Sequence, residues 1–310
     1  MPRHARLDAA VSRRRLLRCG LGTAAGVVVA GATGVELVAH GVLPGKSLLD
    51  LIDGACDVPS VSLDDRRLGE SVSGGFFSRA RRRVVGYTVG YPPGHVRGAE
   101  LPLVVMLHGE GATHTSALPG ATPAEAVAST VMGQPLAPMA LVTVDGGQGY
   151  WHPHLTDDPM AMVVHELIPM LQGWGLGRHP DQIATMGISM GGYGAILVAE
   201  LYPRPFGAVA AISPAVWTSY AQAMAVNPGA YDSASQFASY DAVTHAAALA
   251  RTPVRIASGF ADPFHPAVVG LTERLGPEAQ VVFTGGCHTG PFFRYELPAS
   301  LGFLGARLAG

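Results

Sequence analysis

Gly187, Ser189 and Gly191 form a Gly-x-Ser-x-Gly motif between a short apolar run and a segment of helix-forming residues. This order of strand, sharp turn and helix is typical of a nucleophile elbow, in which the serine hydroxyl stands at the apex of the turn. Glycines allow the backbone to pass close to itself there, where a larger side chain would clash. Such a hydroxyl is suited to attack on an acyl carbonyl carbon, with a covalent acyl intermediate.

A serine hydroxyl is a weak nucleophile until a neighbouring base takes its proton. Behind an elbow of this kind, the acid and the histidine follow the serine along the chain in that order. Asp262 and His288 each stand in a glycine-containing loop just after an expected strand. We therefore expect His288 to be the general base and Asp262 to orient its imidazole, with Asp241 as the alternative acid. We interpret His265 as a loop or pocket-wall residue.

A tetrahedral intermediate also needs backbone donors for its oxyanion. One is expected to be the N–H of Met190, directly after the nucleophile. The second is expected in the loop that follows the strand at 103–107, where the Glu110 N–H would point into the hole by analogy. A carboxylate is unexpected beside a developing negative charge, so the Glu110 side chain must point away, be paired, or lower the activity. His108 is expected to brace this loop.

Aromatic residues are the candidates for the substrate pocket. Tyr150 and Trp151 follow the strand expected at 140–144, and they either line an acyl or alcohol pocket or pack under their loop. Phe264 and His108 are the other candidate pocket residues. No Cys/His cluster has zinc spacing, and no glycine-rich run stands at a phosphate-binding strand–helix junction, so we expect no metal and no cofactor.

Seven short runs are expected to form the strands that position these residues, and several are continuously apolar, as in strands buried on both faces. They lie at 84–90, 103–107, 140–144, 183–186, 208–212, 254–257 and 280–283. Helices are expected from the Asp158 cap to about residue 171, at 195–202 and at 297–308. The alternation predicts a mostly parallel sheet covered by helices on both faces, with the reactive residues at the carboxyl ends of its strands.

Residues 215–251 break this alternation with Asn-Pro-Gly, several serines and short alanine-rich pieces. Such an insertion between two core strands forms either a cap over the pocket or a peripheral excursion.

The composition is that of an ordinary globular protein. The chain has 310 residues, 48% of them hydrophobic and 14% charged, and a net charge of -2. This balance leaves enough apolar residues for a large core and gives no reason to expect nucleic acid as a partner.

The N-terminus has the pattern of a targeting segment. Residues 12–18 read S-R-R-R-L-L-R, which is similar to a twin-arginine export signal, and an uncharged stretch at 21–35 follows. We expect a signal peptide or signal anchor at 1–35, a leader at 36–75 and a catalytic domain at 76–310. The protein would lie in the cell envelope or outside the cell, with membrane association through the N-terminal segment if the signal is retained. The alternative is a basic N-terminus on a cytosolic protein.

Two cysteines, Cys56 and Cys287, remain after the signal. An oxidising compartment allows them to pair, and the alternative is two separate thiols. A bridge would tie the leader to the loop of His288.

Several segments together resemble the esterase D-type esterases, which include S-formylglutathione hydrolases, feruloyl and tributyrin esterases and the mycobacterial secreted mycolyltransferases. They are residues 103–109, 166–169, 187–195, 203–209 and 213–214, within a resemblance over about 76–308. The resemblance implies an α/β-hydrolase fold with a small insertion between the sixth and seventh strands of that fold. It also implies a catalytic triad of Ser189, Asp262 and His288, and an oxyanion hole from the Met190 and Glu110 amides. Glu110 stands where these proteins usually carry an apolar or small residue.

We therefore expect an exported serine carboxylic-ester hydrolase that works through an acyl-enzyme. Its substrate would be a small-molecule, lipid or sugar ester. One alternative is an acyltransferase that passes the acyl group to a sugar or lipid alcohol. The other is a non-catalytic binding relative that keeps the fold.

Overall fold

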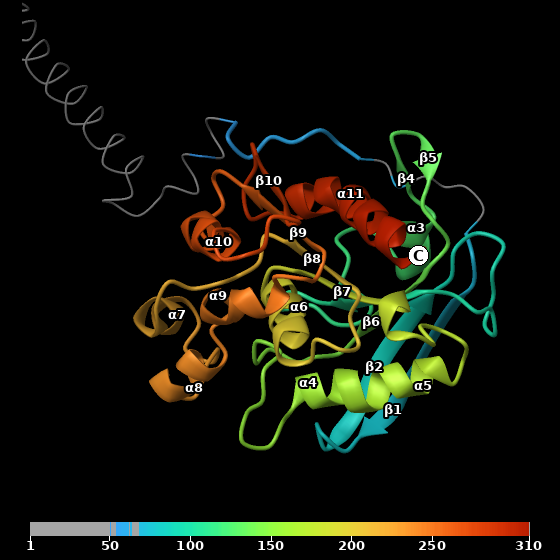
Figure 1. Ribbon diagram of the computed structural model, residues 1–310, viewed down its shortest axis with the longest axis horizontal. Helices are drawn as coiled ribbons and strands as arrows, with labels where there is room; N and C mark the ends of the chain where they lie inside the picture. Colours follow the sequence, from blue (N-terminus) through green and yellow to red (C-terminus); the bar gives the residue numbers. More distant parts are fainter. Residues whose placement is uncertain (1–49, 51–53, 62, 64–67, 310) are drawn as a thin grey trace, which may run out of the picture. The chain divides into compact units, whose positions relative to one another are not determined.

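The computed structural model describes residues 50, 54–61, 63 and 68–309 (Figure 1). The chain divides into two compact units, Met1–Ala55 and Cys56–Gly310. The twin-arginine pattern and the uncharged stretch at 21–35 lie outside the described residues. None of the described helices combines the length and the hydropathy needed to cross a membrane.

An eight-stranded sheet forms the centre of the second unit, in the order β1-β2-β6-β3-β7-β8-β9-β10. The strands are β1 (Ser71–Ser78), β2 (Arg83–Gly90), β3 (Leu103–Leu107), β6 (Ala140–Val144), β7 (Ile183–Ile188), β8 (Ala208–Ile212), β9 (Val254–Gly259) and β10 (Gln280–Thr284). β1 pairs antiparallel with β2, and β2 pairs antiparallel with β6. β6, β3, β7, β8, β9 and β10 are parallel to one another. The predicted mostly parallel sheet is confirmed.

Sequence patterns found every strand of this sheet except β1. β3, β6, β7, β8 and β9 are buried along their whole length, which is why most of their residues are apolar and do not alternate with polar ones. β1 is serine- and glycine-rich and mostly exposed, and it becomes a strand by pairing with β2 from Ser71↔Gly90 to Ser78↔Arg83. The expected boundary between leader and catalytic domain at residue 76 therefore falls inside a strand of the sheet.

Helices cover both faces of the sheet (Figure 1). α3 (Pro123–Val127) and α11 (Gly290–Leu308) share an apolar cluster with one face, which includes Met106 and Met186. On the other face, α6 (Met190–Leu201) and α10 (His265–Thr272) contribute to the larger cluster. The helix-covered sheet expected from the sequence is confirmed.

The helix expected after Asp158 is present but is not uniform. It consists of α4 (Pro159–Met162), a π-helical turn η1 (Val163–Leu167) and α5 (Ile168–Gln172). The Asp158 carboxylate accepts a hydrogen bond from the Ala161 N–H at 2.8 Å, as a cap does. The wider π turn precedes Pro169, which has no N–H to donate to the preceding turn.

The insertion between β8 and β9 forms four short helical pieces. They are α7 (Tyr220–Val226), α8 (Ala234–Ser239), α9 (Ala242–His245) and η3 (Ala246–Leu249). His152, in the loop after β6, anchors them. Its Nε2 lies 2.7 Å from the Ala230 carbonyl oxygen, and its ring stacks on Tyr231 and Tyr240. Burial lowers the pKa of His152 to about 4, so the ring in this stack is neutral.

Candidate active site

Ser189 occupies the turn between β7 and α6, and its backbone has a φ of 57° and a ψ of -122°. A positive φ is strained for a residue with a side chain, and such strain persists only where the surroundings enforce it. Close backbone packing at the two glycines of the motif holds Ser189 in this conformation. A Cβ on Gly187 would lie 2.0 Å from the Gly191 carbonyl oxygen, and one on Gly191 would lie 1.9 Å from that of Leu107. The tight turn therefore holds the hydroxyl at its apex.

Three side chains from three loops meet in a hydrogen-bonded series. His288 Nε2 lies 2.8 Å from Ser189 Oγ, and His288 Nδ1 lies 2.9 Å from Asp262 Oδ2. The other oxygen of Asp262 accepts the Phe264 N–H at 2.9 Å. Asp241, the alternative acid, instead accepts the Val243 N–H and caps α9. The arrangement can take a proton from Ser189 and stabilise the resulting imidazolium.

Asp262 is 3% exposed. Burial alone raises its pKa, but the hydrogen bond and charge of His288 and the Phe264 N–H lower it more, and the net pKa is below the ordinary value. A carboxylate that stays ionised beside His288 is what orienting the imidazole requires.

Backbone hydrogen bonds join the two loops that carry Asp262 and His288, and a disulfide joins the His288 loop to the leader. The Phe260 N–H donates to the Thr284 carbonyl at 2.8 Å, and the Ala261 N–H donates to that of Gly286 at 3.0 Å. Cys56 and Cys287 form a disulfide with their Cα atoms 4.8 Å apart. Of the two alternatives left by the sequence, the structure has the bridge, and it fastens the leader to the residue before His288.

The start of α6 and the loop after β3 border the space beside Ser189. Met190 is the first residue of α6, so its N–H has no carbonyl one turn earlier and lies at the positive end of the helix. The loop after β3 also approaches the serine, because a Cβ on Gly109 would lie 3.5 Å from that of Ser189. The Gly111 N–H donates to Gln148 Oε1 at 2.6 Å, which fixes the loop around Glu110. Sequence reasoning did not find Gln148.

The Glu110 carboxylate is paired. Its Oε1 accepts a hydrogen bond from Asn227 Nδ2 at 2.8 Å. Asn227 follows α7 in the insertion, and its Oδ1 accepts the Gly229 N–H at 2.9 Å, which orients the amide toward Glu110. Nothing in the sequence links two residues 117 positions apart, so this partner was missed.

A pocket of about 390 Å³ opens beside Ser189 and His288. Of the candidate pocket residues, Tyr150 and Phe264 line it. Val226 from α7 lines it too, so the insertion borders the site, as a cap would. Phe293 of α11 is a further apolar wall residue that sequence reasoning did not name.

Neither His108 nor Trp151 lines this pocket, so placing them among the pocket residues was wrong. The bracing role expected for His108 is present, and Trp151 follows the alternative of packing under its loop. His108 Nε2 accepts the Gly146 N–H at 3.0 Å, and its Nδ1 lies 2.8 Å from the Gly109 carbonyl oxygen. Trp151 donates from Nε1 to the His108 carbonyl at 3.1 Å, and its ring fills space left by two glycines. Both side chains brace the loops from below, and burial lowers the pKa of His108.

His265 is likewise not in the pocket lining. It begins α10, with its ring edge-on to Phe260 and Phe283.

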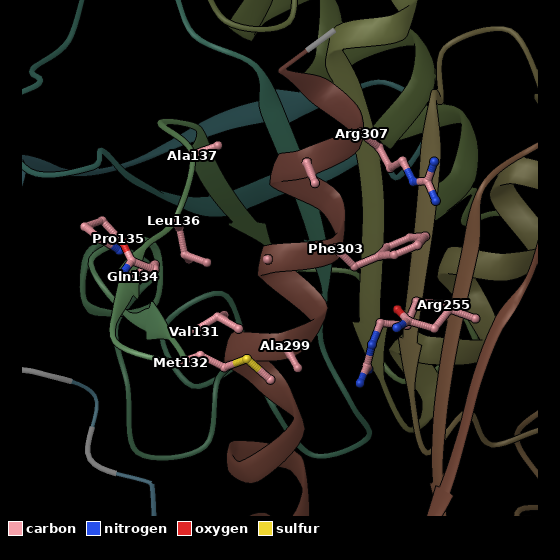
Figure 2. Close-up of a pocket in the computed structure, with 13 residues that line it drawn as sticks. Val131, Met132, Gln134, Pro135, Leu136, Ala137, Arg255, Ala299, Phe303 and Arg307 are labelled. Carbon is pink, nitrogen blue, oxygen red and sulfur yellow. The ribbon is translucent and has the colours of Figure 1, made fainter.

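A larger hollow of about 620 Å³ lies elsewhere, between the short β4–β5 hairpin (Thr130–Val131 and Gln134–Pro135) and α11 (Figure 2). Its lining includes Arg255 and Gln280 from the amino ends of β9 and β10. Ser189 and the loops of Asp262 and His288 follow the carboxyl ends of strands, so this hollow takes no part in the site. Within the described part of the chain, no group of three or more His, Cys, Asp or Glu side chains is placed to hold a metal ion.

Comparisons with known proteins identify the family and the fold of the chain. Residues 78–267 match a family model described as "Putative esterase". A search of curated protein sequences returns no significant match.

Solved structures similar to the chain include a ferulic acid esterase (TM-score 0.64, 18% identity, 76% of this chain and 98% of the other). An S-formylglutathione hydrolase from Agrobacterium tumefaciens has a TM-score of 0.63 and 19% identity over 81% of this chain and all of the other. A fluorophosphonate-binding serine hydrolase of Staphylococcus aureus has a TM-score of 0.60 and 15% identity over 76% of this chain and 98% of the other. At these identities the similarity establishes a shared α/β-hydrolase fold.

Proposed function

We propose that Ser189, His288 and Asp262 are the catalytic triad of this chain, which belongs to the esterase family matched over residues 78–267. The main support is the geometry around Ser189. A serine held in a strained elbow lies 2.8 Å from His288, which lies 2.9 Å from a buried carboxylate. This is the arrangement that nucleophilic catalysis by serine requires.

In the first half-reaction, Ser189 Oγ attacks the acyl carbonyl carbon while its proton passes to His288 Nε2. Asp262 stabilises the imidazolium, and the N–H groups of Met190 and Glu110 donate to the oxyanion. When the tetrahedral intermediate collapses, the bond to the alcohol oxygen breaks and His288 returns the proton to that oxygen. The acyl group is then esterified to Ser189.

In the second half-reaction, water takes the place of the alcohol. His288 accepts a proton from the attacking water, and the second tetrahedral intermediate expels Ser189 Oγ, which recovers its proton from His288. The products are the free acid and the original enzyme.

The pocket supports a short or medium acyl ester as the substrate class. Its volume of about 390 Å³ and apolar wall residues such as Phe264 and Phe293 suit a small apolar group beside the ester. A ferulic acid esterase and an S-formylglutathione hydrolase share the fold, so a feruloyl ester and the thioester S-formylglutathione both belong in a substrate screen.

We test this with p-nitrophenyl esters from acetyl to palmitoyl, comparing wild type with Ser189→Ala. Ser235→Ala, on an exposed position of α8, is the matched control. We expect turnover that peaks at a short or medium chain, is lost in Ser189→Ala and persists in Ser235→Ala. Turnover near the wild-type level in Ser189→Ala would overturn the proposal. Alcohol acceptors added to the same assay would divert the acyl group if the enzyme were a transferase.

Export is the second part of the proposal. The twin-arginine-like pattern at 12–18 supports it, and so does the bridge between Cys56 and Cys287, because structural disulfides persist mainly in oxidising compartments. Replacing Arg13 and Arg14 with lysine should retain the protein inside the cell. Unchanged distribution between cell fractions would count against export.

A further inference from the structure

Glu110 gives the active-site pocket a fixed negative charge. Among the described residues that line this pocket, it is the only Asp or Glu, and no Arg or Lys lines it. Asp262 lies behind His288 and is not part of the lining. Apart from the catalytic histidine, the groups around the carboxylate are small, apolar, aromatic or hydroxyl-bearing.

Contacts on both sides hold this carboxylate in position. The Asn227 amide binds Glu110 Oε1 at 2.8 Å and is itself oriented by the Gly229 N–H. On the backbone side, Gln148 accepts the N–H of the next residue, Gly111, at 2.6 Å. The charge therefore cannot move away from the pocket without breaking the contact with the insertion.

The Glu110 carboxylate lies at the open side of the pocket. Glu110 and Val226 are exposed, whereas Tyr150 is buried at the inner wall. The charge also reaches the interior: burial raises the pKa of Tyr150, and the carboxylate of Glu110 raises it further. A substrate group that passes this side of the pocket meets the same field.

We propose that Glu110 is a specificity-determining residue that selects the substrate by charge. It disfavours esters that carry a carboxylate or phosphate near the scissile bond and favours neutral or cationic ones. The inference rests on the proposed esterase function and adds the substrate class to it. The Asn227 contact is neutral, so it positions the carboxylate and leaves its charge in place.

We expect an effect of about tenfold on the ratio of kcat/KM values. This is the size of the interaction free energy between two unit charges a few ångströms apart at a partly screened surface site. Removing the charge should change the ratio between charged and neutral esters. Removing a carboxylate elsewhere should not change it.

The test compares two pairs of esters that differ mainly in charge. On the acyl side they are p-nitrophenyl valerate and mono-p-nitrophenyl succinate, and on the alcohol side they are butyrylcholine and its neutral analogue 3,3-dimethylbutyl butyrate. The variants are Glu110→Gln, which keeps the shape and an oxygen for Asn227, and the control Glu278→Gln. Glu278 is exposed and precedes β10 at the edge of the sheet opposite the site.

In Glu110→Gln, the kcat/KM ratio of at least one pair should shift by about five- to tenfold toward the anionic ester or away from the cationic one. Glu278→Gln should leave both ratios within twofold of wild type. In the wild type, 1 M NaCl should bring the kcat/KM values of the charged and the neutral ester of that pair closer together. This measurement tests the proposal even if the variant folds poorly.

If the wild type hydrolyses the neutral esters but neither Glu110→Gln nor salt changes either kcat/KM ratio, the charge selection is overturned while the proposed esterase function stands. If the wild type hydrolysed no ester at all, the proposed function would fail and this inference with it.

Discussion

Removing the bridge between Cys56 and Cys287 should weaken both the fold and the active site. The two residues are separated by 231 positions, and a cross-link over so long a loop removes much conformational freedom from the unfolded chain. In the loop-entropy treatment this corresponds to about 5 kcal/mol of stability. For a domain of this size each kcal/mol is worth roughly 2 to 4 °C in Tm, so we expect Cys56→Ser to melt about 10 °C or more below wild type.

The same change should also reduce kcat at temperatures where the protein remains folded. Cys287 directly precedes His288, and the bridge limits how far the histidine can move from Ser189. Because small displacements in a catalytic site are costly, we expect a fall of roughly tenfold.

Calorimetry and ester kinetics with and without a thiol reductant measure both effects. The double variant Cys56→Ser/Cys287→Ser is the control, because the reductant should change nothing more in it. A wild-type Tm that moves by less than about 2 °C on complete reduction, confirmed by thiol titration, would refute the loop argument.

Two further predictions concern carboxylates. Asp262→Asn should lower kcat by roughly 10³- to 10⁴-fold, because the amide cannot stabilise the imidazolium, whereas Asp241→Asn should change kcat by less than about threefold; equal losses would contradict the assignment of the acid. Burial raises the pKa of Glu200 to about 9 from 4.5, so between these pH values the folded state keeps a proton that the unfolded state has released. From this group the free energy of unfolding is highest below pH 4.5 and falls by about 1.4 kcal/mol per pH unit until pH 9. Urea unfolding of Glu200→Gln at pH 6 and pH 8 should show that slope removed, and an unchanged slope would disprove the burial argument.

The sequence was informative wherever local chemistry dictates local structure. The elbow at Ser189 needs glycines at fixed positions, and buried parallel strands need apolar runs, so both are visible in a single segment. Chain order then placed Asp262 and His288 in the loops after β9 and β10, and the His288 side chain contacts both Ser189 and Asp262.

Features that depend on distant segments were not visible. β1 has no apolar run of its own and exists through its pairing with β2. Asn227 contacts Glu110 because the insertion folds back over the site, and no local pattern encodes that approach. The same holds for Trp151, whose residue type suits a pocket wall as well as a buried brace, and only its packing shows that it is a brace. The bracing role of His108 was expected, because it stands in the loop directly after a buried strand.

The claim that Ser189 is the nucleophile is tested most directly by covalent labelling. The purified protein is treated with a fluorophosphonate, its intact mass is measured, and the modified peptide is identified. The account predicts one adduct per chain, on Ser189, with no labelling of Ser189→Ala and much slower labelling of His288→Ala. An adduct on another residue, or ester hydrolysis by a protein that the reagent leaves unmodified, would contradict it.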